Sequence, residues 1–461
     1  MKSRHLFNDR QFYRSLFTMA IPIMLQNLVN AFVNMVDTVM IGRLGTVEIA
    51  AVGLGNQFFF LYNMILFGIS SGGAIFTAQF WGRQDIPGIR KNMGLCLILT
   101  LGTGVFFTLA SLLFSREIMG IYSKDPAVIS AGTVYLRTLS PSYIPYALSF
   151  VFILTLRSTE KVRLAMEASV IALSINMILN YVFIFGLGSV PAMGVQGAAA
   201  ATVIARLAEM IILISVSYGR SYVLAGSIRD FLGFNRPFAR QFFRITTPVV
   251  CNELLWSLGV TVQNIIMART HTDAIAAFNI TNTVSQLTFV VFIGLGNGAA
   301  VLVGNRIGAG AEDTARIYAS RLTRFSVLVA VAVGLIFLSL SPLIPLLFNV
   351  NPNVIAITSA MFIILSCSYP FKAFNMSMIV GVCRAGGDTV FCIFYDLFFM
   401  WCFSLPLAAA ATFFFRVPVW LIFLFIIAEE PLKTILGFRR LRTGKWLHNV
   451  VSAERERPAP S

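Results

Sequence analysis

Long apolar stretches occur along the whole sequence. Residues 97–113 contain no Asp, Glu, Lys, Arg or His, and neither do residues 325–371. A helix needs roughly 20 apolar residues to cross a hydrocarbon layer about 30 Å thick. Because every backbone amide in lipid must be bonded within its own segment, helices are the default spanning structure. The sequence lacks the short alternating stretches of a membrane barrel. We therefore expect an all-α polytopic membrane protein.

Charged residues, Gly and Pro divide these stretches into twelve expected transmembrane segments. The segments lie near residues 14–42, 48–80, 92–114, 131–156, 164–187, 197–218, 245–268, 274–305, 321–347, 354–382, 389–412 and 418–438. The formal net charge of +15 does not indicate a nucleic-acid partner, because the basic residues are scattered between apolar segments instead of forming one polar face. We expect the chain to be embedded in a lipid bilayer and to bind no nucleic acid.

The loops between the segments differ in their content of basic residues. If the N-terminus is cytoplasmic, the loops on the opposite side hold only Arg43, Arg116, Lys124, Arg269 and Arg416. This asymmetry follows the positive-inside rule, and we expect a protein of the cell inner membrane with both termini in the cytoplasm. The polar N-terminal residues lack the short apolar stretch and the cleavage site of a signal peptide.

The two halves of the chain repeat each other. An ungapped shift of 226 residues aligns EIAAVGLGNQ, from Glu48, with AIAAFNITNT, from Ala274, and a shift of 227 places Arg157 on Arg384. Parallel repeats of this kind predict two pseudo-symmetric six-helix bundles with a cavity between them that opens to either side in turn. The expected parts are an N-terminal lobe at 1–218, a cytoplasmic basic linker at 219–244, a C-terminal lobe at 245–438 and a cytoplasmic basic tail at 439–461.

A carboxylate lies within the first expected segment. Asn27, Asn30 and Asn34 precede Asp37 at spacings of three or four residues, so that the four side chains share one helical face. A charged side chain inside a bilayer is costly unless it is paired, hydrated or protonated, and it typically marks an ion pathway. Asp37 is therefore a candidate site for coupling transport to a cation. A structural hydrogen bond near the outer end of the helix is the alternative.

The fifth segment carries amides that suit the same site. Asn176 and Asn180 are four residues apart and share a face, with Ser169 two turns earlier. Amide oxygens can ligate a cation or hold the proton of a carboxylate. If this face meets Asp37, then Asp37, Asn176 and Asn180 are candidate Na⁺ ligands. Hydrogen bonding between helices is the alternative.

The second lobe has different polar residues. The shift of 226 puts Gln263 opposite Asp37, so that the lobes are not chemically equivalent. Glu253 in the seventh segment is a candidate for a second cation-coupling position. Residues assigned to the substrate cavity are Asn34, Gln263, Asn279, Asn282 and Asp396. For Asp396, a salt-bridged cluster with Glu430 or Lys433 remains an alternative.

Nothing in the sequence indicates an enzyme or a bound cofactor. The six Cys lie in or beside apolar segments without metal-binding spacing. The three His, at His5, His271 and His448, lie in tails or a loop, and no HExxH or paired aspartyl motif occurs. We expect no cofactor other than a coupling ion.

Several phrases point to a known family. They are MVDTVMIGRLGTVEIAAVGLGNQ from Met35, LRST from Leu156, NYVFIFGLGSVPAMGVQGAAAAT from Asn180, IAAFNI from Ile275, GLGNGAAVLVGNRIGAG from Gly294 and CRAGGDT from Cys383. Together, over nearly the whole chain, they resemble the multidrug and toxic compound extrusion (MATE) family. The resemblance implies a MATE/MOP-type arrangement of twelve helices, and export of cationic or amphipathic drugs in exchange for inward Na⁺ or H⁺.

The resemblance also implies roles for particular residues. Asp37 is similar to the first-span acid that family members protonate or use to bind a cation, with Asn176 and Asn180 as its fifth-span partners. The sequence departs from the family where Asn180 replaces the second Asp of some proton-linked members, and where Ala373 stands at the tenth-span acid of other branches. Glu253 resembles the seventh-span acid of those branches, about one turn nearer Pro248.

The alternative function within the same fold superfamily is a flippase for lipid-linked precursors. Such a protein is expected to place several basic residues in a central cavity. Here the intramembrane cations are few, chiefly Arg137, Arg206 and Lys372. We therefore favour a multidrug antiporter over a flippase. We expect it to act as a monomer.

Overall fold

The computed structural model describes residues 10–347, 350–415 and 417–452. Within these residues, eleven helical stretches are long and apolar enough to cross a membrane, one of which, Pro126–Ser158, contains a 3₁₀ turn at Ser140–Ser142. The expected all-α polytopic fold is thereby confirmed. His5, Arg416 and the end of the predicted tail, residues 453–461, lie outside the described residues.

The twelfth expected segment, 418–438, is divided into two shorter helices. Helix α16 (Val419–Ile427) ends just before Ala428, and α17 (Glu429–Thr443) begins just after it. Pro431 lies in the first turn of α17 and has no backbone N–H to continue the hydrogen-bond ladder of α16. The interruption places two acids, Glu429 and Glu430, in the first turn of a helix, where the helix dipole favours negative charge.

The chain forms two compact units. Unit 2 is Leu25–Val250, and unit 1 combines the described parts of Met1–Met24 and Cys251–Ser461. Helices α1 (Arg10–Gly42) and α10 (Arg236–Ala268) each supply residues to both units, and each contains a proline, Pro22 and Pro248, close to the change of unit. The lobe and linker boundaries expected from the sequence stay a prediction.

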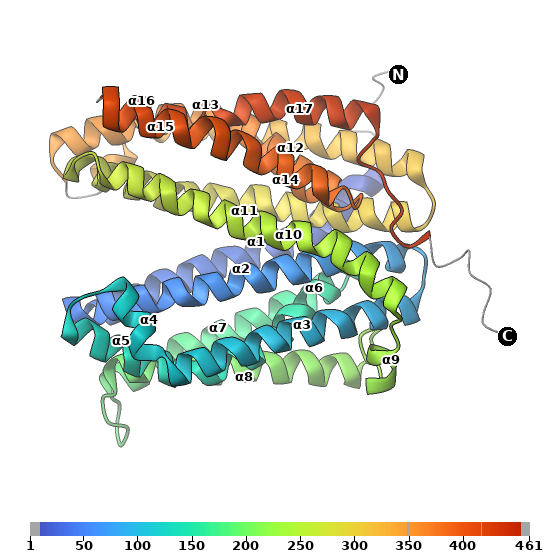
Figure 1. Ribbon diagram of the computed structural model, residues 1–461, viewed down its shortest axis with the longest axis horizontal. Helices are drawn as coiled ribbons and strands as arrows, with labels where there is room; N and C mark the ends of the chain where they lie inside the picture. Colours follow the sequence, from blue (N-terminus) through green and yellow to red (C-terminus); the bar gives the residue numbers. More distant parts are fainter. Residues whose placement is uncertain (1–9, 348–349, 416, 453–461) are drawn as a thin grey trace. The chain divides into compact units, whose positions relative to one another are not determined.

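Unit 2 is built from long helices joined by short turns (Figure 1). Besides parts of α1 and α10, its helices are α2 (Thr46–Gly82), α3 (Ile86–Leu113), α4 (Ser115–Tyr122), α5 (Pro126–Leu139), α6 (Tyr143–Ser158), α7 (Val162–Phe185), α8 (Gly194–Gly219) and α9 (Ile228–Leu232). Helices α7 and α8 can pack closely because Gly197 has no side chain. A Cβ at this position would lie 2.5 Å from the Phe183 carbonyl oxygen. This approach brings the polar residues of α7 next to α8.

Unit 1 has less regular helices. Besides parts of α1 and α10, they are α11 (Thr272–Gly308), α12 (Glu312–Leu340), α13 (Pro352–Met376), α14 (Thr389–Phe399), α15 (Leu405–Ala410), α16 and α17. The wider π-helical turns Ser377–Arg384, Met400–Ser404 and Ala411–Phe415 extend α13, α14 and α15. After α17 the chain folds back onto unit 1, where Trp446 is fully buried and the Asn449 amide donates to the Ile307 carbonyl.

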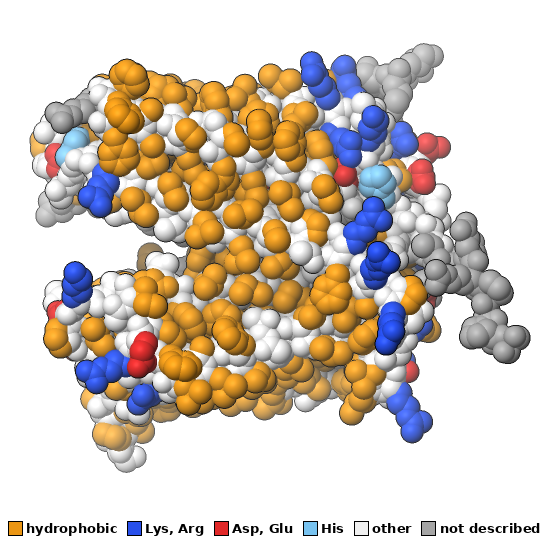
Figure 2. All heavy atoms as spheres, viewed as in Figure 1, with side chains coloured by type: hydrophobic (Ala, Val, Ile, Leu, Met, Phe, Trp, Pro, Cys, Tyr) orange, Lys and Arg blue, Asp and Glu red, His pale blue; other side chains and the backbone are white. Residues whose placement is uncertain are grey.

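The surface of each unit suits lipid. Hydrophobic side chains cover the middle of the helices, and Lys and Arg gather near the helix ends (Figure 2). On α3, for example, Phe106 and Leu109 are exposed. An apolar surface of this extent is a property of membrane proteins and not of soluble monomers.

Candidate ion-coupling site

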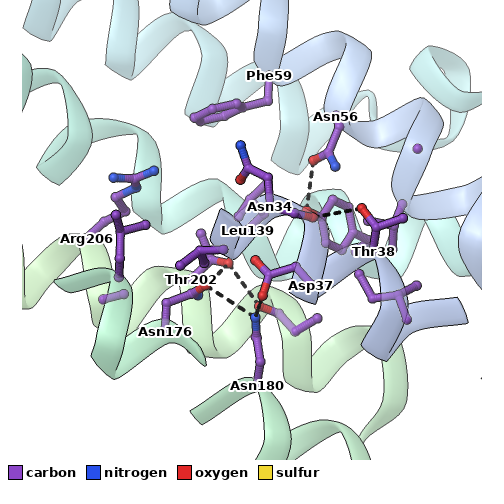
Figure 3. A pocket seen from close by; sticks show the side chains of 18 of the residues that line it. Asn34, Asp37, Thr38, Asn56, Phe59, Leu139, Asn176, Asn180, Thr202 and Arg206 are labelled. Atoms are coloured by element: carbon purple, nitrogen blue, oxygen red, sulfur yellow. Dashed lines mark hydrogen bonds between the residues drawn. The ribbon is translucent and has the colours of Figure 1, made fainter. Parts of the chain in front are cut away.

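Unit 2 contains a cavity of about 490 Å³. Side chains from α1, α2, α5, α7 and α8 line it, and Figure 3 shows ten of them labelled around its centre. One part of the wall is apolar and includes Phe59, Phe60 and Leu139. The other part is polar and includes the carboxylate of Asp37.

The structure brings Asp37, Asn176 and Asn180 together. Asn180 Nδ2 donates to Asp37 Oδ1 at 2.7 Å and to Asn176 Oδ1 at 3.2 Å, and Asn176 Nδ2 donates to Thr202 Oγ1 at 3.3 Å (Figure 3). The chain of hydrogen bonds therefore crosses from α1 through α7 to α8. The sequence did not single out Thr202, whose hydroxyl is carried by α8 opposite the two amides.

One oxygen at this site has no partner. Asn180 Oδ1 is buried and makes no hydrogen bond within the part of the chain that the structure describes. The other end of the same amide, Nδ2, meets the Asp37 carboxylate and the Asn176 carbonyl oxygen. A set made only of oxygen donors suits a hard cation or a proton, whereas softer metals prefer nitrogen and sulfur. The arrangement can hold a small positive charge.

A second charged group lines the same cavity. The guanidinium of Arg206 lies 4.5 Å from the ring centre of Tyr146, and its Nη1 is 3.0 Å from Glu209 Oε2. Glu209 is buried, with 2% of its surface exposed. Arg206 is therefore already neutralised by an acid outside the cavity, whereas Asp37 makes no direct ion pair with any residue that the structure describes.

Glu209 belongs to a buried network that the sequence analysis missed. Ser169 Oγ donates to Glu209 Oε1 at 2.7 Å, Gln26 Nε2 donates to Ser169 Oγ at 2.6 Å, and Arg157 Nη2 donates to Gln26 Oε1 at 2.6 Å. The available signal was a Glu three residues after an Arg in an apolar segment, which a helix places on neighbouring positions.

One contact of this network recurs in unit 1 with different charges. The shift of 227 that places Arg157 on Arg384 also relates three further pairs, namely Gln26 with Glu253, Ser169 with Asp396, and Arg206 with Lys433. Arg384 is ion-paired with Glu253, just as Arg157 contacts Gln26. This one contact is therefore kept while the neutral Gln26 is replaced by an acid, whereas the shift relates Glu209 to the apolar Leu436.

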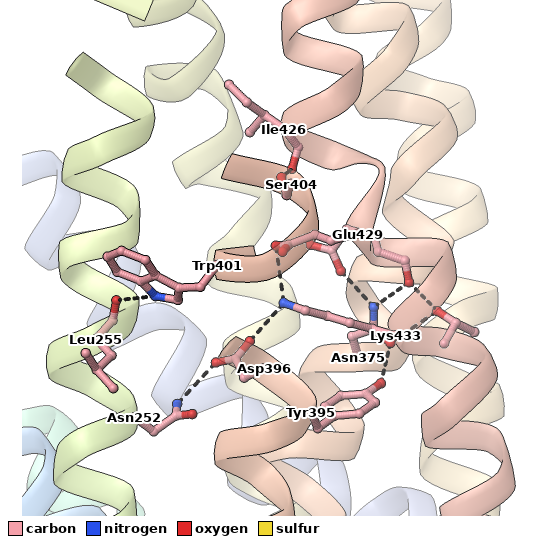
Figure 4. Close-up of polar contacts among 12 residues, drawn as sticks. Asn252, Leu255, Asn375, Tyr395, Asp396, Trp401, Ser404, Ile426, Glu429 and Lys433 are labelled. Atoms are coloured by element: carbon pink, nitrogen blue, oxygen red, sulfur yellow. Dashed lines mark hydrogen bonds and ion pairs between the residues drawn. The ribbon is translucent and has the colours of Figure 1, made fainter. Parts of the chain in front are cut away.

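Lys433 is the centre of the unit 1 network (Figure 4). Its Nζ is 3.1 Å from Asp396 Oδ1 and 3.2 Å from Glu429 Oε1, and Asn252 Nδ2 donates to Asp396 Oδ2 at 3.1 Å. The salt-bridged alternative for Asp396 is therefore correct, with Lys433 as the partner. Glu430 instead accepts a 2.7 Å hydrogen bond from Asn375.

Comparison with known proteins identifies the chain. The MatE family model matches residues 22–182 and 248–410, which is more than half of the sequence. The chain belongs to the MATE family. The resemblance found in the sequence is thus confirmed, and the chain is a multi-pass membrane transporter. MATE proteins are multidrug efflux transporters.

MATE relatives and structures align with almost the whole chain. YisQ of Bacillus subtilis, an uncharacterized transporter, is 25% identical over 95% of this chain and 96% of its own length. A probable multidrug resistance protein NorM of Thermotoga maritima is 26% identical over 95% and 94%. A MATE crystal structure in the straight conformation superposes with a TM-score of 0.85 at 20% identity, over 96% of this chain and 99% of the other. The last comparison confirms the MATE fold.

The remaining predicted site residues of this MATE chain are dispersed. Asn34 lines the cavity of unit 2, whereas Asn27 and Asn30 do not. Gln263 on α10 is half-buried. On α11, Asn279 is exposed and Asn282 is half-buried. These three lie in unit 1, and their place in a substrate cavity, like that of Asp396, stays a prediction. So does a coupling role for Glu253.

Proposed function

We propose that this MATE protein is a secondary antiporter that exports cationic or amphipathic organic compounds in exchange for inward Na⁺ or H⁺. The observation that carries the proposal is the Asp37 carboxylate in a cavity of unit 2, where it accepts a hydrogen bond from Asn180 Nδ2 and makes no ion pair within the described residues. Several relatives are named as multidrug resistance proteins, including PmpM of Pseudomonas aeruginosa and, as a probable one, NorM of Thermotoga maritima.

Exchange follows from competition for one negative charge. An organic cation in the cavity gains electrostatic energy from ionised Asp37, while its apolar part contacts Phe59 and Phe60. A Na⁺ or a proton bound at Asp37 removes this attraction. The two ligands therefore favour different states of the protein, and binding of one promotes release of the other.

The same proposal places the protein in the cell inner membrane as a monomer with cytoplasmic termini. The distribution of basic residues between loops supports this orientation. No observation favours the flippase alternative, because the cavity cation Arg206 is engaged by Glu209 and is not presented to an anionic lipid headgroup. Alternating access between two six-helix bundles completes the proposed mechanism.

Transport in proteoliposomes tests the proposal. We expect an imposed inward Na⁺ gradient or pH gradient to drive efflux of a fluorescent organic cation, ethidium, by the wild-type chain. The Asp37→Asn variant should lose this response, because an amide cannot carry the exchanged charge. Glu167→Gln, which changes an exposed acid on α7, is the matched control and should respond normally. Efflux that ignores both gradients contradicts antiport.

A further inference from the structure

Two buried carboxylates in unit 1 share a single ammonium group. Lys433 contacts both Asp396 and Glu429, and the three residues are only 4%, 7% and 6% exposed (Figure 4). Asp396 comes from α14, whereas Glu429 and Lys433 lie one helical turn apart on α17. With all three groups ionised, this trio of Asp396, Glu429 and Lys433 carries one uncompensated negative charge.

The charged groups around the trio do not cancel that charge. The charge of Arg384 acts on Asp396, but Arg384 is itself ion-paired with Glu253. Glu430 acts on Glu429 and adds a further acid to the same helix turn. Four carboxylates therefore face two cations in this part of unit 1. Burying an uncompensated carboxylate costs several kcal/mol, which binding a proton avoids.

The oxygen atoms show where a proton is held. Both oxygens of Asp396 are engaged, one by Lys433 and one by Asn252. Glu429 has one oxygen on Lys433, whereas its Oε2 is buried without a hydrogen-bond partner in the described part of the chain. An ionised carboxylate should not keep an unsatisfied oxygen in such a place. Glu429 Oε2 is thus the position in the trio that most favours a proton.

We propose that Glu429 is a proton-binding site of unit 1, separate from the Asp37 site of unit 2. Binding of one proton at Glu429 Oε2 changes the net charge of the trio from −1 to 0. Release of that proton restores the charge and draws Lys433 toward both acids. The site makes the conformation of unit 1 sensitive to pH whether the ion at Asp37 is Na⁺ or H⁺.

The repeat shows that this site is particular to unit 1. Ser169 in unit 2 occupies the position equivalent to Asp396 and carries no charge. The single acid of that network, Glu209, faces Arg206 and, through Ser169 and Gln26, Arg157. Unit 2 therefore has no excess of buried acid in its network. The proton site arises because Asp396 and Glu429 replace the hydroxyl residues Ser169 and Thr202 at the positions equivalent under the shift of 227.

Infrared difference spectroscopy of the purified full chain in lipid nanodiscs tests this site as the pH is raised. The carbonyl stretch of a protonated carboxylic acid disappears when the acid ionises. We expect this change in the Asp37→Asn variant, which removes the signal of the proposed coupling site. The spectral change should be lost when Glu429→Gln is added to the Asp37→Asn chain. It should be retained when Glu430→Gln is added instead, because the native Glu430 carboxylate already accepts a hydrogen bond from Asn375.

A second variant keeps the test informative if Glu429→Gln does not fold. Asp396→Asn removes one of the two negative charges around Lys433, so that Glu429 ionises more readily. The midpoint of the infrared change should fall by about one pH unit, a tenfold weaker proton affinity. Absence of the band in the Asp37→Asn chain, its survival with Glu429→Gln, or an unchanged midpoint with Asp396→Asn overturns the proposal. Each of these outcomes is independent of whether Asp37 couples transport.

Discussion

Asp37 and Asn180 are 143 residues apart, and the Asn180 amide donates a 2.7 Å hydrogen bond to the Asp37 carboxylate. The same amide also reaches Asn176, so that α7 fixes the carboxylate of α1 by a shared donor. A carboxylate held in this way is preorganised to bind a small cation. Asn180 is therefore expected to set the ion affinity of the site.

Replacing Asn180 by Ala should weaken ion binding at Asp37. The change removes a hydrogen bond to a charged group, and losses at such positions are about tenfold to a hundredfold in affinity. The measurement is the Na⁺ or H⁺ concentration that gives half-maximal ethidium efflux. Asn27→Ala, on α1 but outside the cavity, is the control and should leave this concentration unchanged.

Glu253 can be tested as a structural ion pair. Glu253→Gln leaves Arg384 buried without this carboxylate, and breaking one partner of such a pair costs roughly 3–5 kcal/mol of stability. We expect a lower thermal midpoint in detergent for Glu253→Gln and for Arg384→Gln. The double variant should recover much of the loss, because two amides replace two charges.

The outcome separates two roles for Glu253. Unit 2 has a neutral Gln26 at the equivalent position, so that a neutral side chain is compatible with this part of the repeat. Additive losses in the double variant would argue against an ion pair. A Glu253→Gln protein of native stability that cannot transport would instead support the coupling role predicted from the sequence.

Gly197 is expected to control the distance between α7 and α8. In Gly197→Ala the new methyl group meets the Phe183 carbonyl, which forces the helices apart and disturbs the Asn176–Thr202 contact. Overpacking of this kind costs about 1–3 kcal/mol. The thermal midpoint should fall, together with the ion affinity.

Gly102 on α3 supplies the comparison for Gly197. A Cβ at Gly102 meets no atom within 4 Å, and Ala is the better helix former. Gly102→Ala should therefore match or slightly exceed the stability of the wild-type chain. Equal losses at both glycines would show that helix packing is not the cause.

Much of the fold was readable from the sequence because lipid imposes a simple rule on length and polarity. Eleven of the expected segments are long helices in the described residues, and the division of the twelfth follows from Pro431. Asp37 and Asn180 were predictable as neighbours because polar groups in a membrane must find one another. To predict this hydrogen bond it was enough to know which polar residues share a face on each helix.

The buried networks were not predictable in the same way. Gln26 and Glu209 make contacts that depend on how three helices are rotated, which the sequence does not give. Glu253 looked like an isolated acid because its partner Arg384 lies 131 residues later. The spacing of 131 residues recurs between Gln26 and Arg157, but the sequence alone does not show that the residues of each pair are in contact.

Competition between ion and drug at Asp37 is tested most directly by equilibrium binding of ethidium to the purified chain at increasing Na⁺ concentration and, separately, at decreasing pH. The account predicts that at least one of these ions weakens ethidium binding by about tenfold or more in the wild-type protein, which corresponds to a coupling free energy of about 1.4 kcal/mol. The Asp37→Asn variant should show no such dependence. An identical dependence in wild type and Asp37→Asn, or none for either ion in the wild type, would contradict the account.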